Sequence, residues 1–385
     1  MTAAIVIAAW LASGAASVAD ARPEEPRPPE PAAAGAVAGE AAAEAADPAT
    51  GVEPARSTWR WAGDALLRYE AVRNAPNPLT SDFERLRLRL RPGVEGPIVP
   101  GRLSAGAGVL VSVASDSNDM NGIRNDNFRS DEVAVDRAWI QLSGASTPFS
   151  ATFGVFETPL RGTEILWDRD LRFQGASAGL ELPPAGALLA QRVVGGVSLG
   201  SQNGEDGSQV ATVRWEGEVA RGLGFGGGYW QFGSTADLVA AGYARTNRLA
   251  PGGEDYLSDY RVANATVRWE WIGRSRPLRL RLDLLRNFGA EDRRHGGELR
   301  VDWGELQDAG SWRLRLALER VEQDAALAAF GGDEWWFRTR QRGARLGWAI
   351  VFWRIASLEF SVLRQRRDDL DEWLDRGWVD LSVSF

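Results

Sequence analysis

The stretch Gly377-Trp378-Val379-Asp380-Leu381-Ser382-Val383-Ser384-Phe385 decides the fold. Its apolar side chains recur at every second position, and polar side chains fill the positions between them; the apolar set is Val379, Leu381, Val383 and Phe385. Because successive side chains of a strand point to opposite faces, this alternation predicts a strand with one apolar and one polar face. A strand that runs to the last residue favours a pairing that closes a sheet, and a closed sheet is a barrel. An ordinary strand end is the alternative interpretation.

The same alternation begins at Trp59 and continues to the end of the chain, in stretches of about ten residues separated by Gly, Pro, Asn and Asp. The pattern predicts sixteen antiparallel strands. One of the clearest alternates leucine with arginine, with Leu86, Leu88 and Leu90 on one face and Arg85, Arg87, Arg89 and Arg91 on the other. Longer polar links, such as Glu157–Leu171 and Glu322–Glu334, alternate with short ones such as Gly273–Pro277. An even strand number with this rhythm is typical of a barrel with long loops at one end.

The polar faces of these strands carry many Arg, Asp, Glu and Ser side chains, which cannot form a dry core. The apolar faces need a cover, and the chain offers no amphipathic helix to supply it. Lipid outside and water inside meet both requirements, and a closed barrel also pairs every backbone amide at membrane depth. The sequence therefore predicts an all-β fold, a transmembrane antiparallel β-barrel of about 16 strands around a water-filled lumen. A soluble β-sandwich, with the same aromatic residues in its core, is the alternative.

Two segments precede the predicted barrel. Residues 1–21 combine the apolar stretch Ala3–Leu11 with small residues up to Ala21, which indicates a signal peptide with its cleavage site. Residues 22–56 are rich in Pro, Ala and Glu and cannot bury a core, so we predict a disordered periplasmic tether there. Residues 57–385 form the barrel.

The composition excludes several kinds of chemistry. The 385 residues include no Cys and a single His, which excludes disulfides, thiolate metal sites and histidine metal clusters. The formal net charge of −8 gives no sign of nucleic-acid binding. The segment Asp116–Gly122 resembles a calcium loop, yet its fifth position is Met120 and its twelfth is Asn127 where that loop needs a Glu, so only a loose divalent site remains open there. We expect no cofactor and no metal.

Three segments resemble the bacterial "putative porin" family of outer-membrane channels: Val135–Leu142, Phe153–Leu160 and Leu166–Gly175. The Trp-Asp-Arg-Asp-Leu motif that begins at Trp167 is the most specific part of this resemblance. The end of the chain also resembles the closing strand of bacterial outer-membrane barrels, in which the barrel assembly machinery reads a terminal Phe with apolar residues before it, here Leu381, Val383 and Phe385. The resemblance implies a passive diffusion channel for small hydrophilic solutes or ions, embedded in lipid of the bacterial cell outer membrane, with no enzymatic activity. It leaves assembly as a homotrimer open.

The link Glu157–Leu171 is the third outward loop, and it resembles the loop of general porins that folds inward and narrows the pore. It carries four acidic residues: Glu157, Glu164, Asp168 and Asp170. Facing this loop we place a ladder of arginines, Arg85, Arg87, Arg89 and Arg91, with further rungs at Arg279, Arg281, Arg313, Arg315, Arg338, Arg340 and Arg342. Acids opposite arginines would produce a transverse field that admits small polar solutes, and the excess of arginine predicts a weak anion preference. Simple structural pairing of the arginines with nearby acids is the alternative.

Two rival functions come from other classes. A non-conducting barrel would serve as a structural or envelope-tethering outer-membrane protein through residues 22–56. An outer-membrane hydrolase would have to start from His295 and Asp292, the only plausible pair. The segment Gly175–Gly179 matches a nucleophile elbow but sits in a strand with no following helix. The segment Gly222–Gly227 matches a dinucleotide fingerprint without a strand–helix–strand unit, so we interpret its glycines as making room within a strand.

Overall fold

The computed structural model describes residues 58–75, 82–115, 132–144, 148–160, 163–199, 208–219, 222–240, 242–272 and 276–385. The predicted signal peptide, the predicted tether and the calcium-loop resemblance at residues 116–122 lie outside these residues. Within them, the helix α2 (Ala236–Ala240) accompanies sixteen strands: β1 (Arg60–Arg73), β2 (Phe83–Val99), β3 (Leu103–Ala114), β4 (Glu132–Ser143), β5 (Phe149–Glu157), β6 (Arg172–Leu182), β7 (Leu188–Leu199), β8 (Gln209–Val219), β9 (Leu223–Gly233), β10 (Arg261–Ile272), β11 (Pro277–Asn287), β12 (His295–Gly304), β13 (Trp312–Val321), β14 (Gln341–Trp353), β15 (Ala356–Arg367) and β16 (Leu374–Ser384). In the described part of the chain, no helix has both the length and the apolar character needed to cross a membrane.

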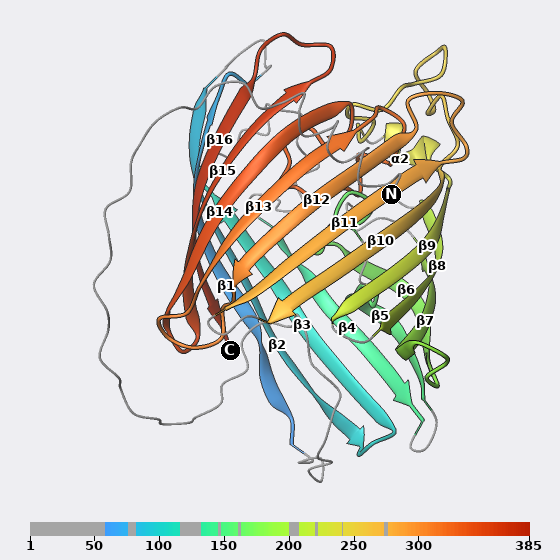
Figure 1. The fold of residues 1–385 in the computed structure, drawn as a ribbon, viewed down its shortest axis with the longest axis vertical. Helices are drawn as coiled ribbons and strands as arrows, with labels where there is room; N and C mark the ends of the chain where they lie inside the picture. The colour runs from blue at the N-terminus through green and yellow to red at the C-terminus, as the bar shows by residue number, and fades with distance from the viewer. Residues whose placement is uncertain are drawn as a thin grey trace. The chain divides into compact units, whose positions relative to one another are not determined.

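Every strand pairs antiparallel with its neighbour in the sequence, and β16 pairs with β1 to close the barrel (Figure 1). In this closing pair Leu381 lies opposite Leu67, and Val383 lies opposite Ala65. Phe385 and Gly63 add two backbone hydrogen bonds, of 2.8 and 3.0 Å. The predicted sixteen-stranded antiparallel barrel is therefore confirmed, and the final residues supply the strand that closes it.

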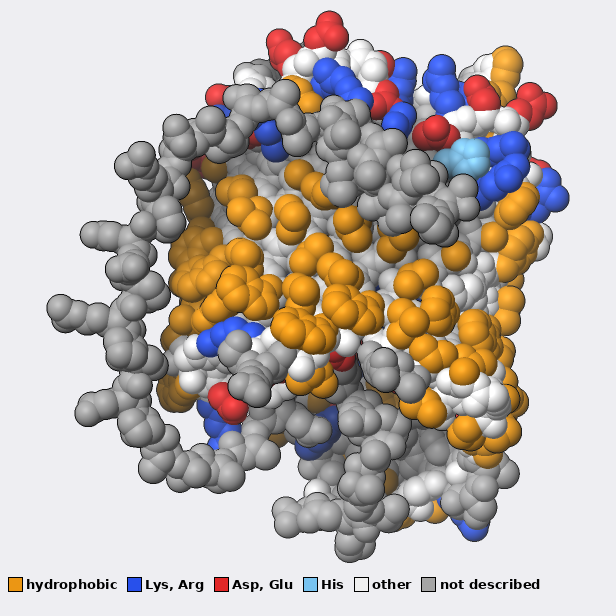
Figure 2. Space-filling view, viewed as in Figure 1, with side chains coloured by type: hydrophobic (Ala, Val, Ile, Leu, Met, Phe, Trp, Pro, Cys, Tyr) orange, Lys and Arg blue, Asp and Glu red, His pale blue; other side chains and the backbone are white. Residues whose placement is uncertain are grey.

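The wall of the barrel is apolar on its outer side. Figure 2 shows hydrophobic side chains spread over the wall, with charged side chains toward its two rims and most of them at the upper one. On β2 the side chains of Leu86 and Leu90 are exposed, whereas those of Arg87 and Arg91, on the other face, are buried. This is the apolar-out and polar-in arrangement that the alternation predicts, because only lipid can cover so large an exposed apolar band without cost.

The glycines of β9 make room for a charged side chain inside the barrel. A Cβ atom at Gly226 would lie 2.5 Å from Nη2 of Arg214, and one at Gly228 would lie 2.6 Å from Oδ1 of Asn264. Arg214 uses the space to donate to Thr266 Oγ1 at 3.0 Å. The glycine-rich segment that matches a dinucleotide fingerprint therefore has a packing role in a strand, as expected from its context.

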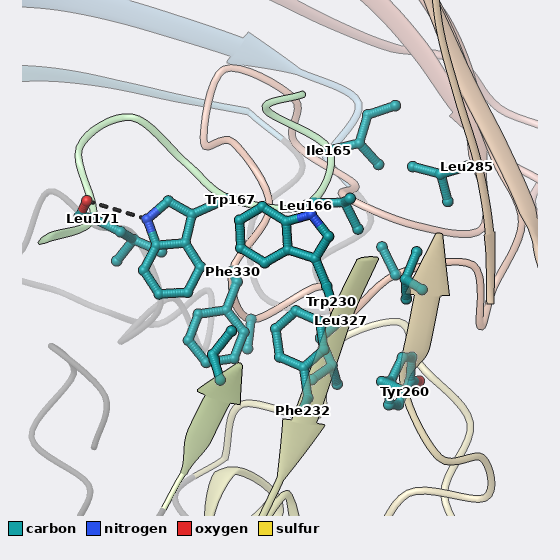
Figure 3. Close-up of a cluster of buried hydrophobic side chains, with 14 of the residues drawn as sticks. Ile165, Leu166, Trp167, Leu171, Trp230, Phe232, Tyr260, Leu285, Leu327 and Phe330 are labelled. Carbon is teal, nitrogen blue, oxygen red and sulfur yellow. Dashed lines mark hydrogen bonds between the residues drawn. The ribbon is translucent and has the colours of Figure 1, made fainter. Parts of the chain in front are cut away.

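The inside of the barrel is not uniformly polar. Described residues of three links fold into it: 158–160 and 163–171 between β5 and β6 (loop 3), 234–240 and 242–260 between β9 and β10, and 322–340 between β13 and β14 (the strap). Their apolar side chains pack with inward-facing residues of the wall into one buried cluster, with Trp167 stacked on Phe330 at 5.2 Å between ring centroids (Figure 3). The prediction that residues 322–334 form a polar outward link is therefore wrong, because the segment buries Leu327 and Phe330 almost completely.

Candidate pore constriction

The arginine ladder lies on the inner face of β2 and pairs with acids of β1. Glu70 accepts two hydrogen bonds of 3.2 Å from Arg85, and its carboxylate lies 3.6 Å from Nη2 of Arg87. Arg89 Nη2 lies 3.1 Å from Asp64. The alternation of leucine and arginine places all four guanidinium groups on the lumen side, because successive side chains of β2 point to opposite faces. The rungs are therefore fixed by neighbouring carboxylates.

Loop 3 meets this ladder through Asp170. Its two carboxylate oxygens accept hydrogen bonds of 2.7 Å from Arg89 and from Arg91. Although burial alone would raise the pKa of Asp170, these two guanidinium groups hold it well below its usual range. The structure thus brings the loop acid into direct contact with the ladder. For Asp170 this is the structural pairing of arginine with a nearby acid, which the sequence left as the alternative to a role in selectivity.

The other loop acids point elsewhere. Glu164 reaches β12, where its carboxylate lies 3.3 Å from Nη2 of Arg300. Burial would raise the pKa of Glu164, but Arg300 and nearby arginines hold it well below its usual range. Glu157 ends β5 and is largely exposed, 3.5 Å from Nη1 of Arg172. Loop 3 is therefore tied to both the β2 and the β12 sides of the wall.

Asp168 faces the strap. It is 3% exposed, and its two oxygens accept hydrogen bonds of 2.7 Å from the backbone amides of Asp170 and Asp333. Burial and the neighbouring carboxylates of Asp333 and Asp170 raise the pKa of Asp168 to about 7. Asp168 is therefore a titratable group at the contact between two loops inside the barrel.

The remaining predicted rungs form ion pairs along the wall. Arg279 pairs with Glu270 at 2.8 Å, Arg281 with Asp283 at 2.5 Å, and both Arg313 and Arg315 with Asp302 at 3.9 and 2.6 Å. Three further arginines do not belong to a ladder on the wall. Arg338 and Arg340 lie in the strap, and Arg342, at the start of β14, is exposed next to the buried Gln341.

The strap is the part of the site that sequence reasoning missed. Its signals are the apolar run Ala325–Phe330 and the aromatic triplet Trp335-Trp336-Phe337, both unusual in a link expected to face water. Phe330 contacts Trp167 of the porin-like motif, so the most specific motif of the sequence packs against the strap. A long outward link with this many large apolar residues needs a buried surface to cover them.

Three carboxylates at this contact could in principle hold a cation. Single oxygens of Asp168, Asp170 and Asp333 lie within 4.8 Å of one another. However, both oxygens of Asp168 already accept backbone hydrogen bonds, and those of Asp170 bind Arg89 and Arg91. A divalent cation needs oxygen ligands that are free to turn toward it. The arrangement therefore does not favour a metal site.

Comparison with known proteins agrees with the barrel fold. Residues 64–198 match the model of a family described as "Putative porin", which confirms the resemblance over that part of the chain. No curated protein sequence matches the chain. Among solved structures, the chain is similar to OprB of Pseudomonas putida at high pH, with a TM-score of 0.58 and 10% identity over 85% of this chain and 94% of that one. It is also similar to a triple mutant of the Rhodopseudomonas blastica porin, with a TM-score of 0.49 and 10% identity over 85% of this chain and 100% of that one. At such low identity, the likeness to OprB shows a shared fold, that of a porin barrel.

Proposed function

We propose that the protein is a porin of the bacterial outer membrane, a passive diffusion channel for small hydrophilic solutes or ions. The observation that carries this proposal is a closed barrel with an apolar outer wall and charged side chains lining its inner face. Barrels of this strand number enclose a lumen wide enough for water, and charged walls favour polar solutes. The family match over residues 64–198 and the porin fold support the same function. Assembly as a homotrimer stays a prediction.

A weak anion preference follows from the way carboxylates are shared near the ladder. Glu70 lies within ion-pair distance of three arginines, at 3.2 Å from Arg85, 3.6 Å from Arg87 and 2.9 Å from Arg376. Asp136 is likewise shared by Arg91, Arg137 and Arg172, at 2.9 to 3.7 Å. Asp170 beside Arg91 and Glu157 beside Arg172 add two carboxylates, but the six arginines still outnumber these four carboxylates. This side of the lumen therefore keeps a positive potential that attracts anions.

The reversal potential in a salt gradient tests this preference. Arg85 and Arg89 are the suitable rungs to change, because their side chains are 12% and 11% exposed whereas Arg87 is buried and would disturb folding. We expect the double variant Arg85→Gln, Arg89→Gln to shift selectivity toward cations. Arg364→Gln is the matched control, because Arg364 lies between the buried residues Leu363 and Gln365 and so points away from the lumen. An unchanged reversal potential in the double variant would remove the ladder from the conduction path.

Uptake of neutral solutes tests the channel itself. Liposomes that contain the folded protein should swell in isotonic solutions of small sugars or amino acids, and swelling should slow as solute size increases. Equal swelling with and without protein would argue against a diffusion channel.

A second candidate function is a barrel that does not conduct and serves a structural role. The observation that favours it is the strap, which fills part of the lumen with buried apolar side chains. Folded protein that gives neither swelling nor conductance would support this candidate over the channel.

A further inference from the structure

The strap, residues 322–340, reaches from one side of the barrel to the other. Phe330 and Leu327 pack in the cluster that includes Trp230 of β9. Trp335 packs with Leu363 of β15 and Trp378 of β16, and Phe337 packs with Val72 of β1. In the closed order of strands, β9 and β16 lie on nearly opposite sides of the barrel (Figure 1). The strap therefore crosses the lumen, and its two halves have different anchors.

The second half of the strap is bound to the wall. Arg376 of β16 donates to the carbonyl oxygens of Asp333 at 2.7 Å and Glu334 at 3.2 Å. Gln365 of β15 donates to the carbonyl oxygen of Phe337 at 2.6 Å and accepts from its amide at 3.0 Å. Each bond is buried, where the loss of one partner leaves the other unsatisfied. This half is consequently a fixed end. The first half is fixed as well, because Asn247 of the link between β9 and β10 donates to the carbonyl oxygens of Gln323 at 2.6 Å and Ala326 at 2.9 Å, and Arg248 donates to Asp324 at 2.6 Å.

The middle of the strap is bound to loop 3 through its backbone. The amide of Asp168 donates to the carbonyl oxygen of Phe330 at 2.7 Å, and the amide of Gly332 donates to the carbonyl oxygen of Glu164 at 2.8 Å. The amide of Asp333 completes the set with its 2.7 Å bond to Asp168 Oδ2. These three hydrogen bonds, the ion pair of Arg169 on loop 3 with Glu334 on the strap, and the Trp167 stack join two loops that come from different sides of the wall. We call this contact the joint.

The joint brings like charges together. The carboxylates of Asp168 and Asp170 on loop 3 and of Asp333 on the strap converge within 4.8 Å. Arg89 and Arg91 from β2 neutralise Asp170. The positive charge of Arg338 on the strap favours the ionised form of Asp168, although burial and the neighbouring carboxylates outweigh it. Mutual repulsion between ionised carboxylates opposes a contact that the hydrogen bonds and aromatic stacking favour. The joint is therefore the place where the two loops can separate while both ends of the strap stay bound.

We propose that the strap is a gate, and that conduction through the channel requires the joint between the strap and loop 3 to open. This inference rests on the proposed channel function and adds to it the element that controls passage. When the joint is closed, the strap and loop 3 together contact β2, β9, β12, β15 and β16 and obstruct the lumen. When it opens, the middle of the strap at Gly331–Asp333 and loop 3 move apart, and a path opens between them while both ends of the strap stay bound.

A disulfide across the joint tests the gate. A Cβ atom at Gly332 would lie 3.4 Å from Cβ of Glu164, at the short end of the distances that disulfides span. The chain contains no Cys, so the double variant Gly332→Cys, Glu164→Cys introduces the only thiols. The oxidised and the reduced protein then differ in one bond alone, which also controls for the loss of the Glu164 carboxylate. We expect the mean current in planar bilayers to fall by about tenfold or more on oxidation and to return on reduction.

The outcomes separate the gate from the channel. If the wild type conducts and the double variant gives equal currents when oxidised and when reduced, the gate is overturned and the channel function stands. If both redox states are silent, a second variant decides, in which a short Gly-Ser linker replaces residues 325–336. That variant should conduct more than the wild type; an unchanged current would overturn the gate. If neither this variant nor the wild type gives a current, although heat-modifiable gel mobility shows that both barrels are folded, the channel function is overturned as well.

Discussion

Protonation of Asp168 should control the joint, and Asp168→Asn should remove that control. The proton binds more tightly when Asp168 is buried in the joint, where its pKa is about 7, than when it is exposed, where the ordinary value is 3.8. The closed joint is therefore most stable below about pH 4, loses this stabilisation as the pH rises to about 7, and changes little above it. Each pKa unit corresponds to about 1.4 kcal/mol, so protonation of Asp168 stabilises the closed joint by at most about 4 kcal/mol.

The corresponding assay is the mean bilayer current as a function of pH. We expect the wild-type current to increase between about pH 4 and about pH 7 and then to level off. Asp168→Asn cannot ionise, so its current should be flat across this range. Glu181→Gln is the control, because Glu181 is an exposed carboxylate near the end of β6 that pairs with Arg192 and should leave the wild-type profile intact. A variant Asp168→Asn that keeps the wild-type profile would refute this account of the joint.

Three further predictions concern the packing of two side chains and one buried ion pair. Phe330→Ala should cost the joint about 3 to 5 kcal/mol through the cavity it leaves and should speed hydrogen exchange of the strap amides, while barrel amides stay protected. Gly226→Ala should displace Arg214 and lower the stability of the folded barrel by about 1 to 3 kcal/mol. The heat-induced shift in gel mobility should then occur at a lower temperature. An unchanged temperature would contradict the role assigned to this glycine. Asp380→Asn should leave the buried Arg68 without the carboxylate that it binds at 2.7 Å. We expect this change to lower the stability of the barrel by about 3 to 5 kcal/mol in the same assay. A loss of stability under about 1 kcal/mol would show that water takes the place of the carboxylate.

The barrel could be predicted from the sequence because its signal is local. Alternation within each strand fixes which side chains face lipid, and one slip of register would reverse every one of them. The pair of β1 with β16 illustrates this, since Leu67 lies opposite Leu381 and a slip of one residue would place a lipid-facing leucine opposite a lumen-facing side chain. The glycine-rich strand β9 could also be placed, because its glycines are interspersed with the outward Phe225 and Tyr229.

The contents of the lumen could not be predicted in the same way. The position of a loop depends on contacts between residues far apart in the chain, such as Trp167 with Phe330, and no periodic pattern encodes them. The alternation within β2 fixes the face that carries the arginine ladder, and this face could be predicted. The partner of each arginine depends on tertiary packing, as with Asp170 between Arg89 and Arg91. The pore-lining roles of these residues stay predictions.

Conductance of the purified wild-type protein in planar bilayers, with a salt gradient across the membrane, tests the central claim most directly. The account predicts discrete current steps at about pH 7 and a reversal potential whose sign shows a weak preference for anions. Absence of current across the whole pH range, from protein that heat-modifiable mobility shows to be a folded barrel, would contradict the channel and favour a structural role.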